Sequence, residues 1–140
     1  MRQNSPLIFI VCASVLVVAA IAVALYLIGS PVQIRASRMD QQRVQELASL
    51  STTISGRHQA GDPLPTTLQD IVKQPQWSYV RIEDPETRAP YEYNVKGPDQ
   101  FEVCAVFATS TEGSPLVTNP TWQHPVGHHC FDFTVKPRPH

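Results

Sequence analysis

The chain has 140 residues and a formal net charge of −1 at pH 7, with 11 basic and 12 acidic side chains. These charges are interspersed and form no basic block, which excludes the electrostatic footprint of a nucleic-acid-binding protein. Thirteen prolines and a charged fraction of 16% favour a loop-rich domain containing β-structure over a helical bundle.

An uncharged apolar run occupies residues 7–28, after a short flank of residues 1–6. At about 1.5 Å per helical residue the run is about 33 Å long, enough to cross the hydrocarbon core of a bilayer. A cleaved signal peptide is the alternative. The apolar core of a signal peptide rarely exceeds about 15 residues and is followed by a small-x-small cleavage site, whereas this run is longer and no such site follows it. The sequence therefore predicts an uncleaved transmembrane helix over residues 7–28, with Tyr26 at the membrane interface.

Gly29, Ser30 and Pro31 interrupt this run, and proline is favoured in the first turn of a helix. We expect a kink here and then an amphipathic extension of the helix over residues 32–55, ended by Gly56. Its apolar residues recur at spacings of three and four and predict one buried face: Val44, Leu47, Leu50 and Ile54. The polar residues fall largely off this stripe: Arg38, Asp40, Arg43, Gln45, Glu46 and Ser49.

Residues 56–136 are enough for one α+β domain with a single core, followed by a tail of residues 137–140. Cys12 lies in the apolar run, whereas Cys104 and Cys130 lie in predicted strands and form the natural disulfide pair. A bridge that closes a loop of about 27 residues would stabilise the fold by about 3 to 4 kcal/mol in the chain-entropy account. The alternative is two buried free thiols.

The charges beside the apolar run leave its orientation ambiguous. Arg2 precedes the run and three arginines follow it, so the positive-inside rule alone places the domain in the cytoplasm. Asp40 and Glu46 accompany those arginines, however, and a disulfide requires an oxidising compartment. We therefore expect the domain to lie in the periplasm.

Within this domain, Thr66 and Gln69 have the spacing of a capping box and predict a short helix that Pro75 ends. The buried side of this helix is expected to be Leu68, Ile71 and Val72. Alternating apolar residues then predict four strands, over residues 78–82, 91–95, 101–108 and 129–135.

The last two predicted strands each place phenylalanines on one face, which we expect to pack on the apolar stripe of the helix. These core residues are Phe101, Val103, Phe107, Phe131 and Phe133. By the period-two rule Cys104 and Cys130 fall on the opposite face, where a cross-strand bridge would hold the long loop of residues 109–128. Trp122 is the expected anchor of that loop. The predicted fold is thus a long N-terminal helix packed on an antiparallel sheet of about four strands.

Three phrases and the order of the elements resemble a known family. The phrases are Leu64-Pro65-Thr66-Thr67-Leu68, Trp77-Ser78-Tyr79 and Asp84-Pro85-Glu86-Thr87-Arg88-Ala89-Pro90-Tyr91-Glu92-Tyr93, followed by the Cys104 and Cys130 strands. Preceded by an apolar helix that continues into an amphipathic one, they resemble type IV pilin-like proteins, particularly the pseudopilins of type II secretion. The resemblance implies a pilin-like fold, an inner-membrane location in a bacterium with the C-terminal domain in the periplasm, and assembly with other proteins.

The chain lacks the cleavage motif of prepilins, in which a glycine precedes a phenylalanine-led apolar run with glutamate as its fifth residue. No Gly-Phe pair and no acidic residue occur before Asp40, so we expect an anchor that remains in the membrane. In pseudopilins a calcium ion can lie in the loops around the sheet. The resemblance places Asp84 and Glu86 in a comparable connection as oxygen donors, without a matched ligand set.

A histidine-rich segment precedes the last predicted strand. His124, His128 and His129, with the thiolate of Cys130, offer the ligand types of a tetrahedral zinc site. A bridge to Cys104 would remove Cys130 as a ligand, and adjacent histidines in a strand point to opposite faces. We therefore expect surface imidazoles and no metal or cofactor, with zinc binding and a pH-sensitive contact as the alternatives.

The sequence contains no G-x-S-x-G phrase and no glycine-rich phosphate loop, so we expect no enzyme. Glu83, Asp84 and Glu86 lie in a predicted turn, where solvation is the usual role of such charges. Four aromatic residues are expected in the sheet and core, with a partner-binding surface as the alternative: Trp77, Tyr79, Tyr91 and Tyr93.

Two functions follow from these features. The first is a non-enzymatic single-pass membrane protein whose pilin-like periplasmic domain contacts proteins of a secretion or pilus-like envelope assembly. The second is a membrane-tethered module that binds a metal or small ligand through residues 124–130. The expected partners are the membrane and an envelope protein, and the oligomeric state is left open.

Overall fold

A computed structural model of the chain describes residues 5–28, 30–114, 117 and 119–136. Gly29 of the expected kink, most of the N-terminal flank and the tail of residues 137–140 lie outside the described residues. The chain divides into two compact units, Met1–Arg35 and Ala36–His140.

The first unit contains helix α1, Ser5–Ile28, whose 24 residues are long and apolar enough to cross a membrane. Its large apolar side chains from Leu7 to Tyr26 are all more than half exposed. This helix is consistent with a single-pass membrane protein. A signal sequence meets the same criteria of length and composition.

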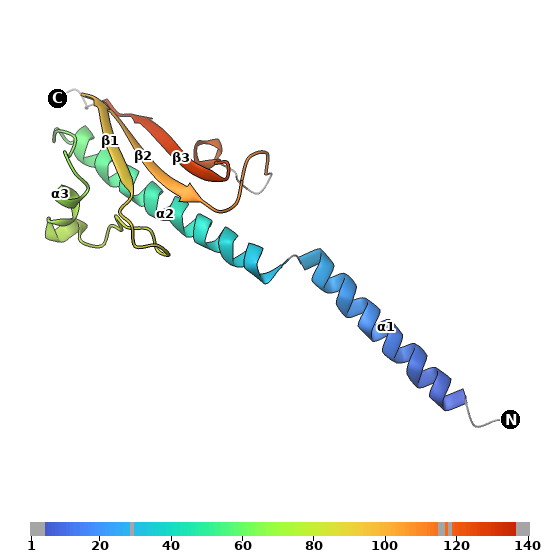
Figure 1. The fold of residues 1–140 in the computed structure, drawn as a ribbon. Helices are drawn as coiled ribbons and strands as arrows, with labels where there is room; N and C mark the ends of the chain where they lie inside the picture. Colours follow the sequence, from blue (N-terminus) through green and yellow to red (C-terminus); the bar gives the residue numbers. More distant parts are fainter. Residues whose placement is uncertain (1–4, 29, 115–116, 118, 137–140) are drawn as a thin grey trace. The chain divides into compact units, whose positions relative to one another are not determined.

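Helix α2, Pro31–Gln59, begins after a break in the helical backbone and lies over the sheet in the second unit (Figure 1). Ser30 caps it, because Ser30 Oγ accepts a hydrogen bond from Gln33 N at 3.3 Å and the Ser30 carbonyl accepts one from Ile34 N at 3.2 Å. Pro31 therefore takes the first helical position, where its missing N–H costs nothing.

The prediction that Gly56 ends this helix is wrong, because α2 continues to Gln59. The stop is Gly61, which has a φ of 104°. Gly61 N donates to His58 O at 3.0 Å and Asp62 N donates to Arg57 O at 3.1 Å, the two hydrogen bonds of a Schellman motif. Left-handed backbone at this position requires glycine, whereas a glycine inside a helix only weakens it.

Among the described residues the sheet has three antiparallel strands in the order β1-β2-β3, one fewer than the four expected. They are β1, Glu92–Gly97, β2, Gln100–Phe107, and β3, Gly127–Thr134. The α+β class and the helix-on-sheet layout are confirmed (Figure 1).

The strand predicted over residues 78–82 is absent. A 3₁₀ helix, Pro75–Trp77, occupies the preceding residues, and Val80 N donates to Trp77 O at 3.0 Å, so a turn takes the donor that a ladder would need. Val80 is nevertheless buried. The apolar alternation of residues 78–82 therefore reflects an irregular segment that contacts the core.

The short helix α3 is Gln69–Val72, and its N-cap is Leu68, with no side-chain capping bond. The side-chain pairing expected between Thr66 and Gln69 is replaced by a pairing between Thr67 and Asp70, one residue further along the chain. Asp70 Oδ2 accepts hydrogen bonds from Thr67 Oγ1 at 2.8 Å and from Thr67 N at 3.2 Å. A carboxylate is a stronger acceptor than an amide, which favours this register.

The core lies between α2 and one face of the sheet. Leu47, Leu50 and Ile54 of α2 are fully buried. The sheet contributes Phe101, Val103, Phe107 and Phe131 as buried residues, and Val44 and Phe133 are partly buried at the edge of the same cluster.

Candidate functional site

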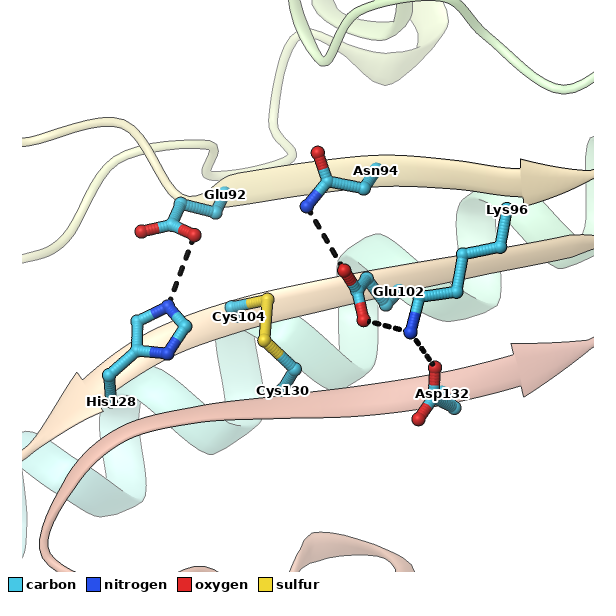
Figure 2. The surroundings of a disulfide bond; sticks show 8 residues. All are labelled: Glu92, Asn94, Lys96, Glu102, Cys104, His128, Cys130 and Asp132. Carbon is cyan, nitrogen blue, oxygen red and sulfur yellow. Dashed lines mark hydrogen bonds and ion pairs between the residues drawn. A yellow bond between two sulfur atoms is a disulfide. The ribbon is translucent and has the colours of Figure 1, made fainter.

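The face of the sheet turned away from α2 carries polar side chains and the disulfide (Figure 2). Residues alternate between the two faces of a strand, so alternate positions of β1, β2 and β3 meet here. The residues drawn are Glu92, Asn94, Lys96, Glu102, Cys104, His128, Cys130 and Asp132.

The disulfide joins Cys104 of β2 to Cys130 of β3, which are directly paired across the ladder. Cys104 is 1% exposed, whereas Cys130 is only partly buried. Glu92 of β1 is the partner of Cys104 on its other side. The bridge therefore stands at the centre of this face, where three strands meet.

One lysine connects all three strands on this face. Lys96 Nζ of β1 lies 2.5 Å from Glu102 Oε2 of β2 and 2.9 Å from Asp132 Oδ1 of β3 (Figure 2). Glu102, and then Asp132, raise the pKa of Lys96, and Lys96 in turn lowers the pKa of Glu102. Because the lysine and Asp132 are solvent-exposed, these pairs contribute little to stability.

At the other end of the face, His128 of β3 reaches across β2 to β1. Its Nε2 lies 3.1 Å from Glu92 Oε2. Among the described residues, the ligand atoms of Cys104, His128 and Cys130 lie within 4.8 Å of one another. His128 is thus the histidine that the fold brings to the cysteines.

The three histidines proposed from the sequence as zinc ligands do not converge. His124 is 1% exposed, and its ring stacks on Phe107 with centroids 3.7 Å apart, so it is not the surface imidazole that was expected. Burial lowers the pKa of His124. The His129 ring packs edge-on against Phe131, with centroids 4.9 Å apart, while its neighbour His128 lies on the outer face.

A buried charge cluster centred on Arg43 lies on the other side of the sheet. Arg43 is 4% exposed, and its guanidinium contacts Asp84 Oδ2 at 2.5 Å, Asp40 Oδ1 at 2.8 Å and Glu86 Oε2 at 2.9 Å. Asp40 also accepts hydrogen bonds from Ala108 N and from the N and Oγ1 of Thr109. The cluster thus joins α2, the segment after residue 83 and the end of β2.

Both buried carboxylates are held in the ionised form. Burial raises the pKa of Asp84, but the hydrogen bonds from Arg43 and from the N–H groups of Thr87 and Glu86 outweigh it and lower the pKa to about 2. Burial also raises the pKa of Asp40. This effect is outweighed by hydrogen bonds from the Thr109 hydroxyl, Ala108 N and Arg43, so the pKa of Asp40 is lowered. Asp84 is therefore not the solvated turn residue that the sequence suggested.

The sequence carried a signal for this cluster that its interpretation missed. Asp40, Arg43, Leu47, Leu50 and Ile54 follow one another at spacings of three, four, three and four. The two charges therefore lie in phase with the buried stripe, and Val44 lies beside it, half-buried. Opposite charges three residues apart on the buried face of a helix indicate a buried ion pair, and another segment of the chain completes its hydrogen bonds.

The four aromatic residues divide between core and surface. Tyr91 is buried, and its hydroxyl donates to Glu46 Oε2 at 2.7 Å, while Tyr93 and Trp77 are partly buried against the core. Tyr79 is 66% exposed. Trp122 packs against Phe131 at a ring-centroid distance of 4.7 Å, which is the anchoring role expected of it.

Comparison of the chain with protein-family models, with curated proteins and with solved structures found no match.

Proposed function

We propose that this chain is a non-enzymatic, single-pass protein of a bacterial inner membrane whose pilin-like domain docks to proteins of a secretion or pilus-like envelope assembly. One observation carries the proposal. An amphipathic helix packs its buried face on a small antiparallel sheet, and a 24-residue apolar helix precedes it in the chain. The phrases from Leu64 to Tyr93 that resemble pseudopilins add to it.

The disulfide supports a periplasmic location for the domain. The Cys104–Cys130 bridge persists in an oxidising compartment and not in the cytoplasm. In this proposal α1 holds the domain at the membrane and the sheet and its connections meet the partner.

Exposed apolar side chains of the domain are the candidate contacts with this partner. Tyr79 is 66% exposed beside Trp77, and Val106 is 60% exposed on the outer face of the sheet. An exposed aromatic residue is a frequent anchor of protein interfaces. These two positions report on different surfaces of the domain.

The proposal is tested by photo-crosslinking in cells with the full chain. A photoreactive residue replaces Tyr79 in one variant and Val106 in the other, and the crosslinked proteins are identified by mass spectrometry. A component of a secretion or pilus-like assembly, crosslinked from one position and not from the other, supports the proposal. Crosslinks from neither position, or only to proteins outside the envelope, contradict it.

The location is tested separately with a thiol reagent that does not cross membranes. A Glu112→Cys variant in a Cys12→Ser background places one exposed thiol on the domain. Labelling of intact spheroplasts is expected if the domain is periplasmic. Labelling only after lysis would place it in the cytoplasm.

The alternative of a ligand-binding module built on residues 124–130 cannot use its three histidines together, because His124 and His129 lie on the core side of the sheet and His128 lies on the outer side.

A further inference from the structure

We propose that the outer face of the sheet holds a redox-dependent zinc site, in which Cys104, Cys130 and His128 bind Zn²⁺ once the disulfide is reduced. The site does not rest on the proposed function. Its ligands differ from the histidine set suggested by the sequence, because the fold selects one histidine and brings it to both cysteines.

The strand register supplies the ligand geometry. Cys104 and Cys130 are directly paired, and His128 lies two residues before Cys130 on the same face of β3. Tetrahedral zinc with ligands at 2.0 to 2.3 Å needs ligand atoms about 3.3 to 3.8 Å apart. The three ligand atoms here lie within 4.8 Å of one another, so they are close to these separations once the S–S bond is opened and the two sulfurs move apart.

Glu92 orients the histidine. Its Oε2 lies 3.1 Å from Nε2 of His128, and Figure 2 shows the imidazole beside the disulfide with one ring nitrogen turned towards Glu92. A histidine that binds zinc through one ring nitrogen commonly donates its other N–H to a carboxylate. Glu92 is therefore a positioning residue that leaves Nδ1 of His128 to bind the metal.

The face also leaves room for a fourth ligand. The side chains of His128 and Glu92 are 50% and 60% exposed, so the metal would be open to solvent on that side. A zinc ion with three protein ligands keeps its fourth position for water or another small ligand. Two thiolates and an imidazole suit Zn²⁺ better than Ca²⁺ or Mg²⁺, which prefer oxygen ligands.

Reduction of the bridge by a dithiol creates the site. A thiolate of the dithiol attacks Sγ of Cys130, the more exposed sulfur, and the S–S bond breaks with Cys104 leaving as a thiolate. The second thiol of the reductant then resolves the mixed disulfide, so the reductant becomes a disulfide and both cysteines become thiols. Zinc binding displaces the remaining thiol protons. The disulfide and the metal therefore exclude each other.

The test measures zinc bound by the full chain in detergent, in a Cys12→Ser background that removes the remaining cysteine. The protein is treated with a phosphine, which is oxidised to its oxide with oxygen from water as the disulfide becomes two thiols. It is desalted without air, and Zn²⁺ is then added. We expect about one equivalent of zinc in reduced protein, held against dialysis, and none in oxidised protein. Reduced protein loaded with Co²⁺ should show the charge-transfer absorption of thiolate ligands.

Matched variants distinguish this site from binding by the cysteines alone. His128→Gln and Glu92→Gln should each weaken zinc binding at least about tenfold, the loss typical of removing even an outer-shell partner. His129→Gln, on the opposite face, and Asp132→Asn, a carboxylate on the same face, should bind as the parent does. Unchanged binding in both His128→Gln and Glu92→Gln overturns the proposal.

Circular dichroism of the reduced chain covers the case in which reduction unfolds the domain. The proposal expects the reduced, zinc-bound chain to give the spectrum of the oxidised one. A reduced chain that binds no zinc, or that stays unfolded when zinc is added, overturns the proposal.

Discussion

At the scale of single residues, the Arg43 cluster shows how charge enters the core of this domain. Arg43 is 4% exposed and faces three carboxylates, two of them buried. Burying such charges costs free energy that only mutual pairing and hydrogen bonds offset. The cluster therefore fixes which segment packs on α2 at this point, and loss of the arginine would leave two buried carboxylates without a cation.

Arg43→Ala should lower the free energy of unfolding by about 3 to 5 kcal/mol, the usual effect of breaking a buried ion pair. Chemical denaturation of the full chain in detergent measures it. Arg38→Ala on the exposed side of the same helix is the matched control and should change stability by less than about 0.5 kcal/mol. Equal effects of the two substitutions would mean that the cluster carries no stability.

Asp84 should make stability depend on pH. Its pKa is lowered to about 2 in the folded chain from an ordinary value of 3.8, so the ionised form is stabilised by folding. This contribution, about 2 kcal/mol, is complete above pH 5 and is lost as the pH falls through 4 towards 2. Denaturation midpoints measured from pH 7 to pH 2 should fall over that window.

Asp84→Asn is expected to flatten this fall while lowering stability at pH 7. Asp132→Asn, an exposed carboxylate on the outer face, should leave the pH profile as it is. A steep acid transition that persists in Asp84→Asn would assign the pH dependence to another group.

At the scale of elements, two glycines near the end of α2 have opposite roles. Gly61 terminates the helix with a φ of 104°, where an L side chain is strained. Gly56 lies inside the helix, and a Cβ placed on it meets nothing within 4 Å. One glycine is required by the backbone and the other is not.

Gly61→Ala should destabilise the chain by about 1 to 2 kcal/mol, because alanine pays the steric cost of left-handed backbone. Gly56→Ala should stabilise it by about 0.5 to 1 kcal/mol through the higher helix propensity of alanine. Thermal unfolding of the two variants side by side measures the difference. A loss of stability in Gly56→Ala would show that this position contacts something that the isolated chain does not.

At the scale of the whole molecule, α1 is a helix long and apolar enough to cross a membrane. Its large apolar side chains are exposed along its whole length from Leu7 to Tyr26. Exposed apolar surface of this extent needs a bilayer or another apolar partner.

Leu16→Arg combined with Val17→Arg should prevent stable membrane insertion, since each arginine near the centre of a spanning helix costs about 2.5 to 3.5 kcal/mol on the insertion scale. Membrane fractions washed at alkaline pH should then lose the chain. Val106→Arg, on the exposed face of the sheet, is the control and should stay in the membrane fraction. Retention of the double variant would argue that α1 is not the anchor.

The sequence by itself determined the features that depend on local pattern. Periodicity alone placed Leu47, Leu50 and Ile54 on one helix face, and the alternation of Phe101, Val103, Phe131 and Phe133 predicted two strands and their core side. The cysteine pair followed because two of the three cysteines lie in strands on the same face. The length of the apolar run was enough to predict helix α1.

The tertiary structure decided what depends on contacts between distant segments. Asp40 and Arg43 are buried because Asp84 and Thr109 arrive from elsewhere in the chain to complete their pairing, which no local pattern records. Residues 78–82 alternate like a strand, but Val80 N is bonded to Trp77 O within a turn and, among the described residues, only Ile82 O accepts from a neighbouring segment, at Tyr91 N, so no strand forms. His128 meets the cysteines and Glu92 only through the register of three strands, because a sheet sets which side chains lie together across the chain.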